Sequence, residues 1–181
     1  AFARVNPIDR DIVTSAQATI GLITVGKAHF DLLEVLRRLD IPLEALAEAG
    51  VRVRKIGLSF PLEPGGIEAF VADLGEVLVV EEKRGIIESQ FKEHFYDYPG
   101  RKPKRMVGKE DEDGHRLIPW VGELTPLQLA EIVAQRLDGE FGGNTYTTRA
   151  QTLLQDPGAS IEVAGAKRIP YFCSGCPHNT S

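Results

Sequence analysis

The sequence predicts a three-layer α/β domain with a mostly parallel sheet. The apolar runs at 20–26 and 77–80 are rich in β-branched residues and too short for buried helices, and each precedes a segment of helical periodicity. Residues 51–57 alternate apolar and basic side chains, which indicates a half-buried strand nearer the sheet edge. Strands that alternate with helices form parallel sheets through right-handed crossovers.

The helices are predicted from apolar side chains that recur every three or four residues. This pattern occurs at 28–39, 43–49, 67–74 and 87–98. Residues 105–108 indicate one more strand. Thr125, Pro126 and Gln128 have the spacing of a capping box, which predicts the start of a helix that continues to Asp138. The only helical pattern after that is at 146–155.

Four segments are expected along the chain. Asn6-Pro7 interrupts the first part, so 1–19 is interpreted as a connector from an upstream domain and 20–138 as the α/β domain. Residues 139–170 are interpreted as an interdomain linker, because so long a stretch with few elements is unusual inside a compact domain. Residues 171–181 begin the next domain. A start without Met and an end directly after a dense motif further suggest a segment of a longer polypeptide.

Charge and hydropathy exclude two classes of protein. The 181-residue chain has 21 Lys and Arg against 26 Asp and Glu, a formal charge of -5, which argues against non-specific nucleic-acid binding. No stretch approaches the roughly 20 apolar residues of a membrane-spanning helix, and no signal peptide is recognisable. The sequence therefore predicts a cytoplasmic protein without a membrane span.

The carboxyl end of the strand at 77–80 carries the charged run Glu81-Glu82-Lys83-Arg84. Ligands of open parallel sheets gather at this edge, so an acid/base pair is one interpretation of the two carboxylates. Adjacent strand residues point to opposite faces, however, and Lys83 and Arg84 offer neutralisation. A structural role through ion pairs is the favoured interpretation.

Two other patterns have simple structural interpretations. Residues 21–28 fit most of the phosphate-loop pattern, but the residues between its glycines form the strand itself, and alanine replaces the hydroxyl that would hold magnesium. Gly26 is expected to turn the strand into its helix, with Lys27 solvated. His29, His94 and His115 lack spaced partners and are interpreted as core or surface histidines.

Cys173 and Cys176 form a Cys-x-x-Cys pair, the spacing at which two thiolates bind one metal ion or iron–sulfur cluster. Two thiolates are half of such a site, so further ligands would have to come from elsewhere. A redox-active dithiol is a rival interpretation, although that motif usually opens a helix near the start of its domain. The third interpretation is a pair of reduced thiols that binds no ligand.

Several motifs together resemble the indolepyruvate ferredoxin oxidoreductases. These are Ile23–Ala28, Val79–Arg84 with Ile87–Gln90, Val107–Lys109 and Phe172–His178, in the order in which that family has them. The resemblance covers nearly all of the chain from Ile20. It departs from the family at Ser174, where proline is common, and this change should loosen the turn without removing a ligand.

The resemblance implies an enzyme that uses thiamine diphosphate, magnesium and a 4Fe–4S cluster. Such enzymes decarboxylate aryl 2-oxo acids oxidatively onto coenzyme A and reduce ferredoxin. The region then resembles the transketolase C-terminal domain, between the two thiamine-binding domains. Cys173 and Cys176 become candidate cluster ligands, and His178 lies near thiamine diphosphate. The thiamine-activating glutamate and the magnesium ligands belong to other domains, so no catalytic residue is placed in this chain.

The expected role of the chain is structural. We expect it to pack between other domains of the same polypeptide, to support a homodimer, and to be inactive alone. A further role considered for it is to line the path of coenzyme A or of electrons. Two alternatives stay open. One is a subunit-assembly module that contacts no cofactor, and the other is a structural zinc site at Cys173 and Cys176.

Overall fold

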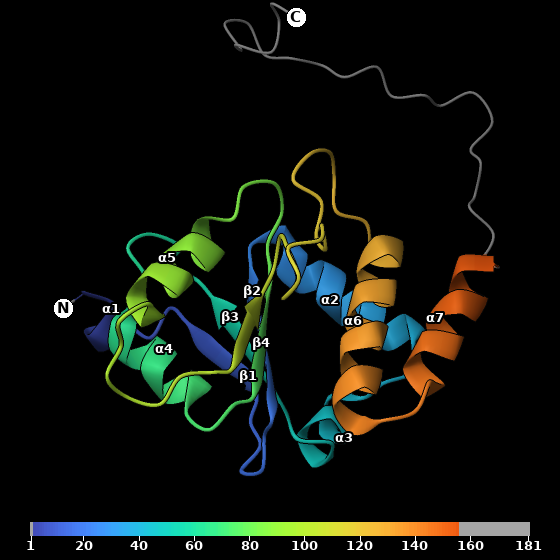
Figure 1. Cartoon of the computed structure of the whole chain (residues 1–181), viewed down its shortest axis with the longest axis horizontal. Coiled ribbons are helices and arrows are strands. Elements are labelled where there is room, and N and C mark those ends of the chain that lie inside the picture. Colours follow the sequence, from blue (N-terminus) through green and yellow to red (C-terminus); the bar gives the residue numbers. More distant parts are fainter. Residues whose placement is uncertain (1, 156–181) are drawn as a thin grey trace, which may run out of the picture.

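The computed structural model describes residues 2–155, which form a five-stranded sheet with helices on both faces (Figure 1). The strand order is β1-β3-β2-β4-β5, and every neighbouring pair is parallel except β1 with β3. The strands are β1 Arg10–Val13, β2 Ile20–Val25, β3 Val51–Ile56, β4 Glu76–Val80 and β5 Arg105–Val107. The predicted three-layer, mostly parallel α/β architecture is confirmed.

The helices divide between the two faces of the sheet, on its left and right in Figure 1. One face carries α2 Lys27–Arg38, α3 Leu43–Glu48, α6 Pro126–Phe141 and α7 Thr145–Gln155, and the other carries α4 Pro64–Val71 and α5 Ile86–Phe95. The short helix α1, Phe2–Val5, precedes the first strand. No helix among residues 2–155 is long and apolar enough to cross a membrane.

The sheet separates two hydrophobic clusters, and β4 contributes to both. Leu78 and Val80 pack under α2 and α6, whereas Val77 and Val79 pack under α4 and α5. All five residues of β4 are buried. Helices therefore cover β4 from both sides, which explains why it has an unbroken apolar run rather than an alternating one.

Strand β1 differs from the expected connector at 1–19. It pairs antiparallel with β3 and occupies the edge of the sheet, so β3 is the second strand from the edge. Its four residues include Arg10 and Asp11, both exposed, and so show little alternation. Short, charged strands are typical of sheet edges, where they discourage pairing with other chains.

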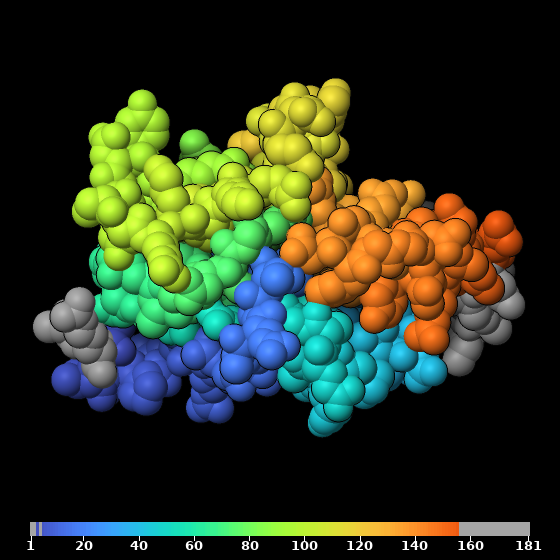
Figure 2. Space-filling model, turned by 60° about the horizontal axis from the view of Figure 1, so that its bottom comes forward, coloured from blue at the N-terminus to red at the C-terminus, as the bar shows by residue number. Residues whose placement is uncertain are grey.

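The carboxyl-terminal part of the described fold is also longer than expected. Helix α6 continues past Asp138 and ends at Phe141, and the Asp138 carboxylate accepts hydrogen bonds from the amides of Tyr146 and Thr147 at the start of α7. Ala150 of α7 is buried in the core. Figure 2 shows these two helices side by side on the surface. The predicted linker therefore contains a packed helix up to Gln155, and 156–170 lies outside the described residues.

Candidate functional site

The position where this fold class holds ligands lies between β2 and β4. The helix that follows β2 covers one face of the sheet, and the helix that follows β4 covers the other. From β2 the chain moves toward one edge of the sheet, and from β4 it moves toward the other edge, so the strand order reverses between these parallel neighbours. Ligands of open α/β sheets bind in the crevice outside the carboxyl ends at such a point. Gly26 and Lys27 follow β2 at this carboxyl edge, and Glu81 and Glu82 follow β4.

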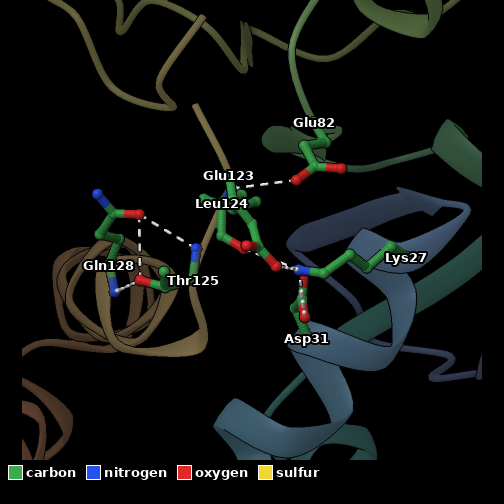
Figure 3. A network of polar contacts seen from close by, with 7 residues as sticks. All are labelled: Lys27, Asp31, Glu82, Glu123, Leu124, Thr125 and Gln128. Carbon is green, nitrogen blue, oxygen red and sulfur yellow. Dashed lines mark hydrogen bonds and ion pairs between the residues drawn. The ribbon is translucent and has the colours of Figure 1, made fainter. Parts of the chain in front are cut away.

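Lys27 makes several contacts at this carboxyl edge (Figure 3). Gly26 has a φ of 55°, the left-handed conformation that turns β2 into α2 as expected. The Lys27 Nζ lies 2.9 Å from an Asp31 carboxylate oxygen and 3.2 Å from Glu123, and it donates a 3.0 Å hydrogen bond to the Leu124 carbonyl. The hydrogen bond to Asp31 raises the pKa of Lys27. Lys27 is exposed, as expected, but it also binds a loop nearly a hundred positions away, which the sequence did not indicate.

Glu82, which follows β4, binds the same loop. Its carboxylate accepts a 3.2 Å hydrogen bond from the Leu124 amide, and the Leu124 side chain is buried in the core. Thr125 then begins α6 with the predicted capping box: its hydroxyl accepts from the Gln128 amide, and the Gln128 side chain accepts from the Thr125 amide. The loop of residues 119–124 is thus fixed across the carboxyl ends of β2 and β4.

Glu81 and Glu82 both follow β4 but bind different segments: Glu82 binds Leu124, and Glu81 binds the start of α5. Its two carboxylate oxygens each lie 2.9 Å from an amide nitrogen, those of Ile87 and Glu88. The residue before α5 is Gly85, which has no side chain to cap the helix, so Glu81 satisfies two of its free amides and places negative charge at its amino end. Burial raises the pKa of Glu81.

Lys109 provides the positive charge near Glu81. Its side chain is 2% exposed, and its Nζ donates to the carbonyls of Glu81 at 2.6 Å and Pro119 at 3.1 Å. Burial lowers its pKa. Lys83 and Arg84, the neutralising partners expected from the sequence, are exposed instead. Lys109 follows β5, so its proximity to Glu81 depends on strand order, which local spacing does not reveal.

The remaining polar residues of the motif at 87–90 also bind neighbouring segments. The Glu88 carboxylate accepts from the Lys109 amide at 2.8 Å and pairs with Lys92. Gln90 donates to the Ser59 carbonyl and accepts from the Leu62 amide, which fixes the loop between β3 and α4. The polar side chains of this motif therefore join strand ends, loops and helix starts.

The arrangement at the carboxyl edge is suited to positioning rather than to proton transfer. Both oxygens of Glu81 accept amides, Lys27 is paired with two carboxylates, and the Leu124 side chain is buried in the core. A general acid or base needs an atom within hydrogen-bonding reach of a substrate. Here these atoms are engaged by the protein's own chain, which supports the structural interpretation of Glu81 and Glu82.

The three histidines lie apart from one another, as expected. His29 is buried and forms a 2.9 Å hydrogen bond with Thr24, and burial lowers its pKa. His94 pairs with Glu68, and the exposed His115 pairs with Asp111. In the described part of the chain, no three His, Cys, Asp or Glu side chains are grouped so that they could hold a metal ion.

The candidate ligands Cys173, Cys176 and His178 lie outside the described residues. Their assignment as two cluster ligands and a neighbour of thiamine diphosphate stays a prediction. The pattern itself supplies two thiolate donors, half of the four that a 4Fe–4S cluster requires.

A family model described as the indolepyruvate oxidoreductase domain matches residues 10–157. The chain belongs to this family. The matched range begins at β1 and ends just after α7, so it includes the edge strand and the last helix of the described fold. The motif residues that bind across the carboxyl edge all lie within it.

Curated relatives extend this match over most of the chain. The indolepyruvate oxidoreductase subunit IorA of Thermococcus kodakarensis is 29% identical over 164 residues, which are 91% of this chain and 22% of the relative. The subunit of the same name from Pyrococcus horikoshii is 27% identical over equal shares. The chain therefore spans about a fifth of the length of these relatives.

Two solved structures are also similar to the chain. A 2-oxoglutarate:ferredoxin oxidoreductase from Magnetococcus marinus, solved with 2-oxoglutarate, coenzyme A and succinyl-CoA, shares 19% identity at a TM-score of 0.47, covering 71% of this chain and 19% of that one. A split-gene transketolase, in the form of an inactive tetramer, shares 18% identity at a TM-score of 0.40, covering 81% of this chain and 42% of that one.

Proposed function

We propose that this chain is a structural α/β domain within an enzyme that oxidatively decarboxylates aryl 2-oxo acids to acyl-coenzyme A and reduces ferredoxin. Family membership supports the class of enzyme. The observation that carries the structural role is the engagement of Lys27, Glu81 and Glu82 by the protein's own loops and helix starts. The domain alone has no turnover and acts by packing between other domains of a cytoplasmic, homodimeric enzyme.

Other parts of the enzyme would supply most of the chemistry. When bound, thiamine diphosphate with magnesium would supply the decarboxylation chemistry, and clusters would supply a path for the electrons. From this chain, Cys173 and Cys176 would be cluster ligands, and His178 would lie near thiamine diphosphate. Thiolates are the usual ligands of such clusters, which fits the Cys-x-x-Cys pair.

Iron and acid-labile sulfide measured in the intact polypeptide test the cluster assignment. Cys173→Ser should lower both together, because a hydroxyl is a poor ligand for iron in a cluster. Ser174→Ala, in the same turn, is the matched control and should keep the iron. Unchanged iron in Cys173→Ser would contradict the assignment, and stoichiometric zinc in the unaltered protein would establish the structural zinc site instead.

A subunit-assembly module is the second candidate function. It is favoured by the exposed apolar side chains at the carboxyl edge, among them Trp120, Val121 and Ile86. The two candidates differ in the activity of the intact polypeptide. Reduction of ferredoxin that depends on both indolepyruvate and coenzyme A supports the enzyme. Normal assembly in a protein that carries no thiamine diphosphate and has no such activity supports the module.

A further inference from the structure

The loop of residues 119–124 exposes two large apolar side chains at its tip. Val121 is 87% exposed and Trp120, the only tryptophan of the chain, is 45% exposed. Ile118, just before the loop, and Leu124, its last residue, are fully buried. The backbone therefore leaves the core and returns to it within a few residues, and Figure 1 shows the loop protruding beyond the carboxyl ends of the strands.

The base of this loop is fixed on both sides. Lys109 binds the carbonyl of Pro119, and Lys27 binds the carbonyl of Leu124 and the carboxylate of Glu123. Glu82 accepts the Leu124 amide. A loop held in this way presents its tip in one position, so a partner would not have to order it on binding. Rigid presentation of a tryptophan is typical of the energetic centre of an interface.

The surroundings of the tip have the composition of an interface rim. The loop between β4 and α5 ends at the same edge of the sheet, where Ile86 is 50% exposed and Lys83 and Arg84 are exposed. The contact of Glu82 with Leu124 joins the two loops. An apolar centre next to exposed polar and charged side chains is the usual arrangement of a protein–protein contact.

We propose that the 119–124 loop is a docking anchor for another domain of the same, longer polypeptide. The relatives of this chain are much longer than it, since the matched 164 residues are 22% of their length. Helix α7 ends at Gln155 on the side of the fold toward which the carboxyl ends of the strands point, so the polypeptide continues from the side on which the anchor projects (Figure 1). This inference rests on the proposed interdomain role, and it identifies the surface through which the domain would contact its neighbour.

Alkylation of single introduced cysteines in the intact polypeptide tests the anchor. Val121→Cys and Tyr96→Cys are matched, because the two native side chains are 87% and 79% exposed and Tyr96 follows the other end of α5. Reaction with a maleimide, followed peptide by peptide with mass spectrometry, should be at least about tenfold slower at position 121 than at position 96 if the tip is docked. Equal rates at the two positions would overturn the anchor.

The identity of the occupant is tested by dilution and by a second variant. Protection at position 121 that disappears on dilution would show that a second copy covers the tip, and would overturn docking within one polypeptide. Val121→Asp should raise the rate at which a limiting protease separates this domain from the rest of the polypeptide by about tenfold, with Tyr96→Asp as the control. These measurements do not depend on activity, so an inactive polypeptide would refute the proposed reaction and leave the anchor intact.

Discussion

The base and the tip of the 119–124 loop are a few residues apart and have opposite environments. At the base, Lys109, Lys27 and Glu82 bind the backbone of Pro119 and Leu124, and the Leu124 side chain lies in the core. At the tip, Trp120 and Val121 project from the surface. The charged residues of this edge stabilise the fold, whereas the apolar residues of the tip contribute little to it.

At this edge, the burial of the side chains is the reverse of what their residue types suggest. Charged residues at the carboxyl end of a central strand suggest an active site, and apolar residues suggest core. At this edge the charges of Glu81 and Lys109 are buried, and Trp120 and Val121 are exposed. Removing a group from the base should therefore change the stability of the domain, and removing one from the tip should change its contacts with other domains.

Among the charged residues of this edge, Lys109→Met should have the largest effect on stability. It retains much of the apolar stem but leaves the carbonyls of Glu81 and Pro119 without a donor, and the carboxylates of Glu81 and Glu88 without their buried positive charge. A buried polar group left without its partner costs about 1–3 kcal/mol, and a broken buried charge network more, so we expect a loss of about 3 kcal/mol. Urea denaturation followed by circular dichroism measures the loss.

Lys83→Met is the matched control for this prediction. Lys83 belongs to the same charged edge but is exposed, so its replacement should change the free energy of unfolding by no more than about 0.5 kcal/mol. Equal losses in the two variants would mean that the edge depends on its total charge rather than on the buried lysine.

Glu81→Gln should have the second largest effect. The carboxylate accepts the amides of Ile87 and Glu88 with separate oxygens, and glutamine offers one acceptor oxygen and one NH2 group. One amide at the start of α5 then faces another donor, and we expect a loss of about 2 kcal/mol. In the intact enzyme, the substitution should affect stability, measured as the melting temperature, more than it affects the rate of decarboxylation. A normal melting temperature with activity abolished would assign Glu81 to catalysis instead.

Much of the fold can be predicted from the sequence, because its signals are local. The apolar run of β4, the capping box at Thr125 and the turn at Gly26 each depend on residues close in the chain, and the structure confirms all three. Strand β1 was missed because four residues with two charges carry no periodic signal. Its place at the edge depends on pairing with β3, a distant segment.

The partners at the carboxyl edge could not be predicted for the same reason. Glu81 meets Lys109 and Lys27 meets Leu124 only after the strands take the order β3-β2-β4-β5 and α6 returns to the sheet. The sequence instead suggested the nearest charges, Lys83 and Arg84, as partners of Glu81. A lysine flanked by glycine and an acidic residue after β5 carries no local sign that it will be buried.

The loss of stability caused by Glu81→Gln should depend on pH, and this dependence should be smaller than the loss itself. Burial raises the pKa of Glu81 above its ordinary value of 4.5, so between that value and the raised one the folded protein binds more protons at this site than the unfolded chain does. The stabilisation from this group is then present at low pH and declines as the pH rises through the raised pKa. Glutamine does not titrate, so the difference between the two proteins should narrow as the pH rises.

Melting temperatures of the unaltered protein and of Glu81→Gln, measured at matched pH values from acidic to neutral, test this direction. Glu76 also has a raised pKa from burial, but it is present in both proteins and cancels in the difference. A difference that widens as the pH rises would mean that the amides of α5 hold Glu81 ionised more strongly than burial opposes it.

Val121→Asp should have the smallest effect on the stability of the domain. Val121 is 87% exposed, so its free energy of unfolding should change by no more than about 0.5 kcal/mol. Leu124→Ala, three residues further along the same loop, removes a buried side chain and should cost about 2–5 kcal/mol. Denaturation of the two variants therefore compares tip with base directly. A large loss from Val121→Asp would place the tip among the residues that hold the fold together, and it could then no longer serve as a surface free to bind another domain.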